Sequence, residues 1–160
     1  MAREGTPAFT GLALHHDRKW RYRFWYPHEW RRFALLDNRE GVLYAPDPVD
    51  FSTSFSVEIK DLGTKITKDD VPDLYQGFLQ GIQSLEECTI ETHESWDVAD
   101  LIGLEAKYTF REKGCLRKRW VRLLFEGKRQ FHVVAQGASP AEYEYWLPML
   151  YEMMTTLAID

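Results

Sequence analysis

The ten residues Arg21–Trp30, with the sequence RYRFWYPHEW, constrain the fold of this chain more than any other stretch. Three aromatic side chains recur at every second position and therefore share one face of an expected strand: Tyr22, Phe24 and Tyr26. Pro27 has no N–H to donate to a sheet, so the strand either ends there or lies at an edge. We expect a strand from about residue 18 to 26, then a turn through which Trp30 folds back as an anchor.

Two further strands are predicted before the first helix. Gly41–Pro46 is apolar and is closed by a Pro-Asp-Pro sequence, and Ser54–Lys60 alternates apolar and polar residues. Residues 1–17 are expected to form a lead-in segment. Its apolar residues, Phe9, Leu12 and Leu14, offer either a short strand or a segment packed over the sheet.

An apolar stripe predicts a helix that begins near Thr67, where Thr67 and Asp70 resemble a capping box. Apolar residues then recur at three- and four-residue spacing: Val71, Leu74, Tyr75, Phe78, Leu79, Ile82 and Leu85. Gly77 and Gly81 weaken the helix by up to ~1 kcal/mol each relative to alanine. We expect these glycines to let the helix sit close to the sheet.

A second helix is predicted at the end of the chain, with an apolar face from Tyr143 to Leu157. Ser139 is its expected N-cap, Pro140 takes the first helical position, and Glu142 completes a capping box. Pro148 is expected to kink this helix or to split it after about two turns. Both helices are expected to contribute to the core.

Between the two helices the sequence predicts consecutive strands joined by short turns. They are Cys88–Trp96, Leu101–Arg111, Cys115–Phe125 and Arg129–Gln136. Turns this short join antiparallel neighbours, so the long strands form a meander. The order strands, helix, strands, helix predicts an α+β fold, an antiparallel sheet with helices packed on its faces, in one domain over residues 18–160.

The motifs in this order resemble the PsbP-like domain family, which includes PsbP of photosystem II, the Mog-type Ran-binding factor and bacterial proteins of unassigned role. The opening strand runs into Tyr26-Pro27 and Trp30, and Gly41–Pro46 and Ser54–Ile59 are similar to the strands that follow in the family. Gly103-Leu104-Glu105-Ala106 resembles its Gly-x-x-Ala strand, and Tyr143–Leu157 its closing helix. The resemblance implies an antiparallel sheet between helices, an α/β/α sandwich, and a role in binding or assembly rather than catalysis.

No catalytic, cofactor or metal motif stands out in the sequence, and we predict none of these sites. The spacings of a nucleophile elbow and of phosphate loops are absent. The segments His15–Asp17 and His28–Glu29 flank the first strand, but a ten-residue strand spans ~33 Å, which separates them too far for one metal ion. Cys88 and Cys115 are predicted to be reduced thiols, with a single disulfide as the alternative.

Positive charge concentrates in the expected hairpin from Arg111 to Arg129. We predict that Arg117, Arg119 and Arg122 bind a partner, and that reversing Arg117 and Arg119 barely changes stability because both are exposed. The alternative is a solvated sheet face balanced by acidic residues: Glu91, Glu94 and Glu105.

We therefore expect a non-catalytic protein-binding or assembly module with no cofactor. The alternative is a small-molecule-binding or enzymatic domain that uses an aromatic-lined sheet face. The net charge of −5 argues against a nucleic-acid partner. The chain has no apolar run of membrane-spanning length and no signal peptide, so we expect a cytoplasmic protein. Both a monomer and a homodimer are compatible with the sequence.

Overall fold

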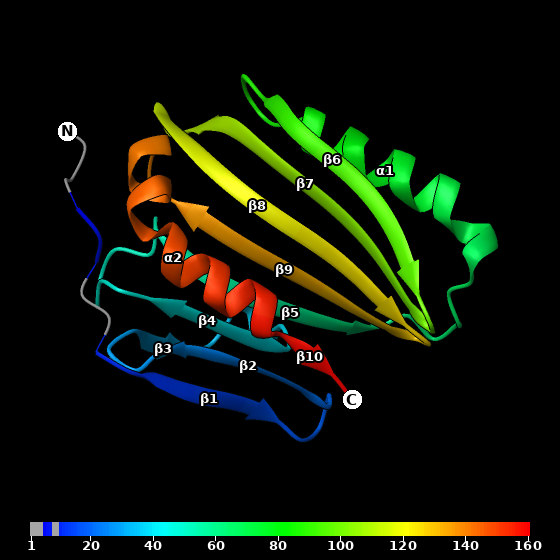
Figure 1. The fold of residues 1–160 in the computed structure, drawn as a ribbon. Helices are drawn as coiled ribbons and strands as arrows, with labels where there is room; N and C mark the ends of the chain where they lie inside the picture. Colours follow the sequence, from blue (N-terminus) through cyan, green and yellow to red (C-terminus); the bar gives the residue numbers. More distant parts are fainter. Residues whose placement is uncertain (1–4, 8–9) are drawn as a thin grey trace.

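The computed structural model describes residues 5–7 and 10–160, and Phe9 lies outside them. A seven-stranded sheet has the order β3-β4-β5-β9-β8-β7-β6, and a three-stranded sheet has the order β1-β2-β10 (Figure 1). The helices are α1 (Val71–Gln83) and α2 (Pro140–Thr156). The strands are β1 (Leu12–Asp17), β2 (Tyr22–Pro27), β3 (Arg31–Phe33), β4 (Gly41–Ala45), β5 (Ser54–Asp61), β6 (Thr89–Val98), β7 (Leu101–Glu112), β8 (Cys115–Glu126), β9 (Arg129–Gly137) and β10 (Ala158–Ile159).

The predicted α+β architecture is confirmed, including the meander of long strands. Strands β6, β7, β8 and β9 follow one another in the chain and pair antiparallel in that order. Strand β5 pairs antiparallel with β9, so the chain places an earlier strand beside the last strand of the meander. The short turns at 113–114 and 127–128 account for the antiparallel pairing on both sides of β8.

The opening strand differs from its predicted bounds, because β2 starts at Tyr22 rather than at about residue 18. Residues 18–21 form a turn in which Arg21 takes a left-handed conformation (φ 56°). Asp17 stabilises this turn by accepting a hydrogen bond from the Trp20 N–H at 2.9 Å. The turn folds β1 onto β2, so residues 12–17 of the expected lead-in form a strand of the small sheet.

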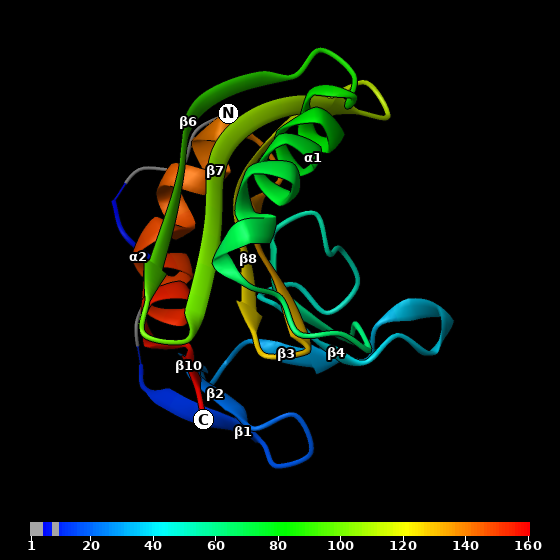
Figure 2. The ribbon, with the colours of Figure 1, turned by 90° about the vertical axis from the view of Figure 1, so that its right-hand side faces the viewer.

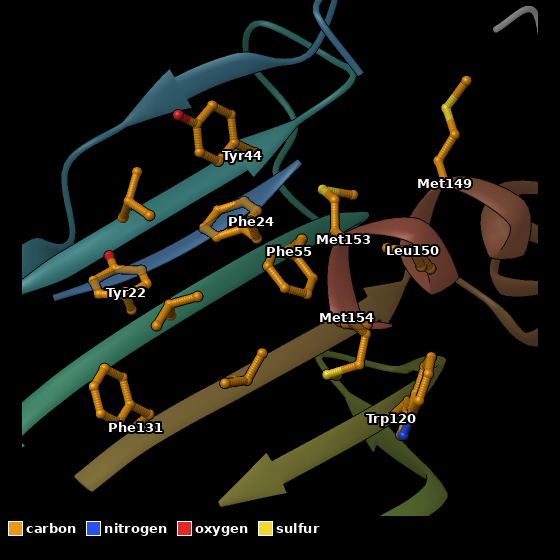
Figure 3. Close-up of a cluster of buried hydrophobic side chains, with 14 of the residues drawn as sticks. Tyr22, Phe24, Tyr44, Phe55, Trp120, Phe131, Met149, Leu150, Met153 and Met154 are labelled. Atoms are coloured by element: carbon orange, nitrogen blue, oxygen red, sulfur yellow. The ribbon is translucent and has the colours of Figure 1, made fainter. Parts of the chain in front are cut away.

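The aromatic face of β2 is buried as the alternation predicted. Tyr22 and Phe24 are fully buried, and Trp30 is 5% exposed after a turn in which its N–H bonds the Pro27 carbonyl. These side chains join a large core between the seven-stranded sheet on one side and the small sheet and α2 on the other (Figure 3). The same core includes Phe55 of β5 and Phe131 of β9.

Helix α1 covers the opposite face of the large sheet, as Figure 2 shows. Its apolar stripe is mostly half-buried, and Ile82, at 7% exposure, is its only buried residue. Phe78 is half-buried and packs against two small clusters built on β7 and β8. The expected role of Gly77 and Gly81 is wrong, because a Cβ at either position would meet no atom within 4 Å.

The predicted N-cap of helix α2 is confirmed, with the Ser139 hydroxyl accepting a hydrogen bond from the Glu142 N–H at 3.1 Å. A kink or a split was predicted at Pro148, and the split does not occur: the helix is continuous over Pro140–Thr156 and bends in Figure 1. Pro148 is exposed, and the carbonyl that it frees belongs to the exposed Glu144, where water can satisfy it. Burial of the neighbouring Met149 and Leu150 holds the helix together across the proline.

Candidate partner-binding surface

The three arginines predicted to bind a partner do not form one exposed patch. Arg117 donates a hydrogen bond to the Ala138 carbonyl at 3.0 Å and pairs with Glu112 at 3.5 Å, and its side chain is 13% exposed. Arg119 lies on the same face, donates to the Gln136 side chain at 2.6 Å and covers the ring of Phe110. The expectation that both side chains are exposed is therefore wrong, because each is tied to neighbouring backbone or side chains.

Arg122 lies on the other face of β8, and its side chain is also bonded to a neighbouring protein group. Its Nε donates to Glu105 at 2.7 Å, and the Trp120 indole donates to the same carboxylate oxygen at 2.6 Å. Burial opposes ionisation of Glu105, but these two hydrogen bonds, together with one from Glu94 and the charge of Arg122, hold the pKa of that carboxyl below its usual value. Lys118 pairs with Glu91 at 2.9 Å. Acidic neighbours thus neutralise much of the positive charge of this hairpin.

His15 sits in a sealed polar cluster between the small sheet and β4. Its ring nitrogens lie 2.9 Å from the Tyr44 hydroxyl and 3.3 Å from the Tyr22 hydroxyl. Burial, together with the charge of Arg32, lowers the pKa of His15 to about 4. Burial likewise raises the pKa of both tyrosines above their ordinary value. With 5% exposure, His15 meets no solvent-borne substrate and holds the two sheets together as a neutral ring.

The histidine segments that flank the first strand are kept apart. His15 and His16 pair with Phe24 and Arg23 near the closed end of the β1–β2 hairpin, whereas the His28 N–H bonds the Gly11 carbonyl at the open end. Within residues 5–7 and 10–160, no group of three or more His, Cys, Asp or Glu side chains is arranged to hold a metal ion. Cys88 and Cys115 are both free cysteines.

Two adjacent hollows flank Trp146 near the start of α2. The first has a volume of about 250 Å³ and is lined by Pro7, Thr10, Pro27, Glu29, Trp30, Pro46, Tyr145, Trp146 and Met149. The second has a volume of about 310 Å³ and is lined by Pro46, Asp47, Pro48, Asp50, Thr53, Ala138, Glu142 and Trp146. Pro46 and Trp146 line both hollows, so the two form one surface, which we call the Trp146 surface. Figure 1 shows the β4–β5 loop and the start of α2 at the same end of the molecule.

Three aromatic rings form the wall of the first hollow. The Trp30 and Trp146 rings meet edge to face with centroids 5.6 Å apart, and Tyr145 meets Trp146 in the same manner at 5.0 Å. The Trp30 indole N–H is buried and has no acceptor within the described part of the chain. The Trp30 ring is therefore held by packing, while Tyr145 and Trp146 stay half-buried and keep accessible surface.

The charged residues among the described lining residues of the Trp146 surface are acidic. Glu29 lines the first hollow, and Asp47, Asp50 and Glu142 line the second, whereas no Lys or Arg is among the described lining residues. Asp47 accepts hydrogen bonds from the N–H groups of Val49 and Asp50, which orders the loop that carries it. Hydrogen bonds from Ser52 lower the pKa of Asp50, so its carboxylate stays charged.

The sequence did not reveal this surface. Its parts come from the turn after β2, the Pro-Asp-Pro loop after β4 and the first turns of α2, which are distant in the chain. Trp30 was expected only as an anchor, and the Pro-Asp-Pro sequence only as the end of a strand. The one available signal was a cluster of prolines and carboxylates next to aromatic residues, which is common in ordinary loops.

The chain has a PsbP-like fold, as comparison with solved structures shows. The solution structure of cyanobacterial PsbP (CyanoP) from Synechocystis sp. PCC 6803 aligns with a TM-score of 0.64 at 14% identity over 98% of both chains. LpqN of Mycobacterium tuberculosis, described as involved in cell envelope biogenesis, aligns with a TM-score of 0.63 at 13% identity over 94% of this chain and 91% of that one.

The Ran-binding protein Mog1p of Saccharomyces cerevisiae aligns with a TM-score of 0.56 at 10% identity, over 93% of this chain and 95% of that one. No family model matches the sequence, and no curated protein matches it. At identities this low, the structural alignments establish a common fold alone. The function has to be argued from this chain's own residues.

Proposed function

We propose that this chain is a non-catalytic protein-binding or assembly module and that it binds its partner at the Trp146 surface. The observation that carries the proposal is the pair of adjoining hollows with aromatic walls and carboxylates at a loop-rich end of the molecule. Half-buried aromatic side chains in such hollows are the usual anchors of protein interfaces. The solved structures with this fold include one that is named a Ran-binding protein, which agrees with a binding role.

The two hollows lie at the lower end of the size range of ligand pockets. Pockets that enclose a drug-sized ligand measure roughly 300–1,000 Å³, and the two hollows measure about 250 and 310 Å³. The aromatic sheet face proposed as an alternative ligand site is occupied, since Tyr22, Phe24 and Phe55 are fully buried beneath the small sheet and α2. The histidine with the most strongly shifted pKa, His15, is buried in the core, where a solvent-borne substrate does not reach it.

The basic hairpin remains a competing surface for the same function. Arg117, Arg119 and Arg122 are engaged with protein groups, but a partner that approaches β8 could still recruit the exposed Lys113 at its turn. No helix in the described residues is long and apolar enough to cross a membrane. We propose that the chain acts in the cytoplasm. Its proposed partner is a protein, rather than a nucleic acid or a membrane.

Site-specific crosslinking in the native host tests the proposal. A photo-crosslinking amino acid is placed at the exposed Pro48 of the Trp146 surface, at the exposed Gln76 of α1 and at Lys113 of the basic hairpin. We expect a discrete crosslinked partner from position 48 and none from position 76. Crosslinking from position 113 alone would assign partner binding to the basic hairpin. Crosslinking from position 76 alone would exclude both the Trp146 surface and the basic hairpin as the binding site.

A further inference from the structure

We propose that two copies of this chain associate through strand β1, which pairs antiparallel with β1 of the second copy and joins the two small sheets into one. Strand β1 is an edge strand, because the small sheet has the order β1-β2-β10, and Figure 1 shows no strand beyond it. The outer edge of such a strand carries backbone N–H and C=O groups that can bond to a further strand. This interface is separate from the Trp146 surface and does not depend on the proposed function.

Strand β1 is the least protected of the four sheet edges. Strands β3 and β10 have only three and two residues, which gives a partner little to pair with. Strand β6 has ten residues, but it is interrupted by a bulge between Ile90 and Thr92 and carries acidic side chains: Glu91, Glu94 and Asp97. Strand β1 has six residues and contains no proline, lysine or bulge. Its edge is therefore open to pairing.

Hydrogen bonds of β2 show which residues of β1 face that edge. The backbone groups of successive strand residues point to opposite sides. The Trp25 N–H bonds the Thr156 hydroxyl at 3.0 Å on the β10 side, so the alternate residues of β2 bond to β1: Tyr22, Phe24 and Tyr26. Their register partners on β1 bond back to β2 and are Asp17, His15 and Ala13. The remaining backbone groups of β1 point outward and belong to Leu12, Leu14 and His16.

One register satisfies all of these outward groups. If Leu14 lies opposite Leu14 of the second copy, Leu12 lies opposite His16 and His16 opposite Leu12, so outward groups meet outward groups in every pair. Each pair of this kind exchanges two hydrogen bonds. A shift by one residue would set outward groups against groups already bonded to β2. A shift by two would leave one residue of β1 without a partner in the other β1.

An apolar row crosses the proposed interface in this register. Leu14 lies opposite Trp25 of β2, and both side chains are 43% exposed on the outer face of the small sheet. Leu12 is exposed on the same face. When Leu14 meets its copy, the two Leu14–Trp25 pairs become neighbours and form a row across four adjacent strands. Cross-strand contacts between aliphatic and aromatic side chains stabilise a sheet, and the row covers apolar surface that the single chain exposes.

Charge complementarity favours a second copy as the occupant of this edge. Arg18 follows β1 and Glu29 lies near its start, and neither has an ion-pair partner among the described residues. The Thr10 hydroxyl donates a hydrogen bond to Glu29 at 2.6 Å and holds the carboxylate at that end. The proposed register brings Arg18 of one copy level with Thr10 of the other. Arg18 therefore approaches Glu29 of the second copy, and the two-fold symmetry repeats this contact.

Sedimentation velocity at increasing protein concentration tests the association. We expect the mass to rise from one chain to two in the wild type. Leu14→Arg should remain a monomer, because it brings two like charges together at the two-fold axis. Its side chain is exposed, so thermal unfolding should show an intact fold. The matched variant Leu36→Arg places the same charge on another exposed leucine outside β1 and should dimerise like the wild type.

A charge exchange tests the predicted neighbours. Arg18→Glu should weaken dimerisation at least about fivefold, because it replaces two attractive contacts in the dimer with two repulsive ones. Glu29→Arg should weaken it by a similar factor. The combined variant restores opposite charges at both contacts and should recover most of the lost affinity.

Hydrogen exchange of backbone amides, followed by NMR, tests the register. At low protein concentration the amides of Leu12, Leu14 and His16 should exchange rapidly, and at high concentration they should become protected by the new hydrogen bonds. The amides of Ala13 and His15 bond to β2 and should be protected at both concentrations.

Four outcomes would overturn the inference. A wild type that stays monomeric at every concentration would exclude the dimer. A dimer that tolerates Leu14→Arg, or one in which the three outward amides stay unprotected, would have its interface elsewhere. Equal loss of dimer in Leu14→Arg and Leu36→Arg would show a general effect of added charge. A combined charge variant as weak as the single variants would reject the register that joins Arg18 to Glu29.

Discussion

The rings of Trp30 and Trp146 meet edge to face with their centroids 5.6 Å apart and thereby join the turn after β2 to helix α2. Trp30 is 5% exposed, whereas Trp146 is half-buried and also lines both hollows. One ring of this pair therefore serves mainly the core and the other mainly the surface. Stability and partner binding should respond differently to the two residues.

Replacing each tryptophan by alanine should separate these roles. Trp30→Ala should lower the free energy of unfolding by ~3–5 kcal/mol because it empties a buried site, and Trp146→Ala by a smaller amount, about 1–2 kcal/mol. The double variant should reveal a coupling of ~0.5–1.5 kcal/mol, typical of edge-to-face pairs. Urea titration of the four proteins measures these values, and additive losses would contradict a direct contact.

Gly103 of β7 faces Trp96 of β6 as its cross-strand partner, and the indole ring lies over the glycine. A Cβ at position 103 would come within 2.3 Å of that ring, so Gly103→Ala should push Trp96 outward and cost ~1–3 kcal/mol. Gly77→Ala is the matched control, since its Cβ meets no atom within 4 Å. It should stabilise α1 by up to ~1 kcal/mol. Equal effects of the two substitutions on thermal stability would refute this account.

His15 makes the stability of the fold sensitive to acid. Its pKa is about 4 in the native state and 6.5 in the unfolded chain, so between these values the unfolded chain binds the extra proton. Stability should therefore fall as the pH drops from 6.5 to 4, with His15 contributing roughly 2 kcal/mol of loss at pH 5. Burial lowers the pKa of His132 too, which acts in the same direction.

The variant His15→Gln cannot titrate but keeps polar atoms near Tyr22 and Tyr44. Its unfolding free energy, measured in urea at pH 7.5 and pH 5, should decrease less than that of the wild type. If both proteins lose the same stability over this interval, His15 is protonated in the native state and the assignment is wrong.

Reversing the paired arginines should destabilise the fold. The double variant Arg117→Glu and Arg119→Glu breaks hydrogen bonds to Ala138 and Gln136 and should cost at least about 2 kcal/mol, because partly buried acceptors lose their donors. The control reverses Lys113 and Lys128, which are exposed at the turns on either side of β8, and should change stability by no more than about 0.5 kcal/mol. Thermal unfolding of both double variants measures these losses. If the arginine variant is as stable as the wild type, Arg117 and Arg119 form an exposed patch, as the sequence predicts.

Local patterns in the sequence determined the secondary structure and the fold class. The alternation in β2, β5 and β7 predicted which side chains are buried, because successive residues of a strand face opposite sides whatever the strand packs against. Ser139 and Pro140 predicted the start of α2 for an equally local reason, since a helix N-terminus needs a cap within its first turn. The choice between a kink and a split at Pro148 was less predictable, because it depends on which side of the helix faces solvent.

Only the tertiary structure decided which charges are available and which residues form the candidate site. The sequence offers Glu91 and Glu105 as balancing acidic residues only as an alternative. The packing of β6 and β7 against β8 is what pairs them with Lys118 and Arg122. Trp30, Pro46 and Trp146 likewise meet only after the β2–β3 turn, the β4–β5 loop and α2 pack together. Pairing of charges and closure of a hollow depend on distances between segments remote in the chain, and no local preference of the backbone encodes those distances.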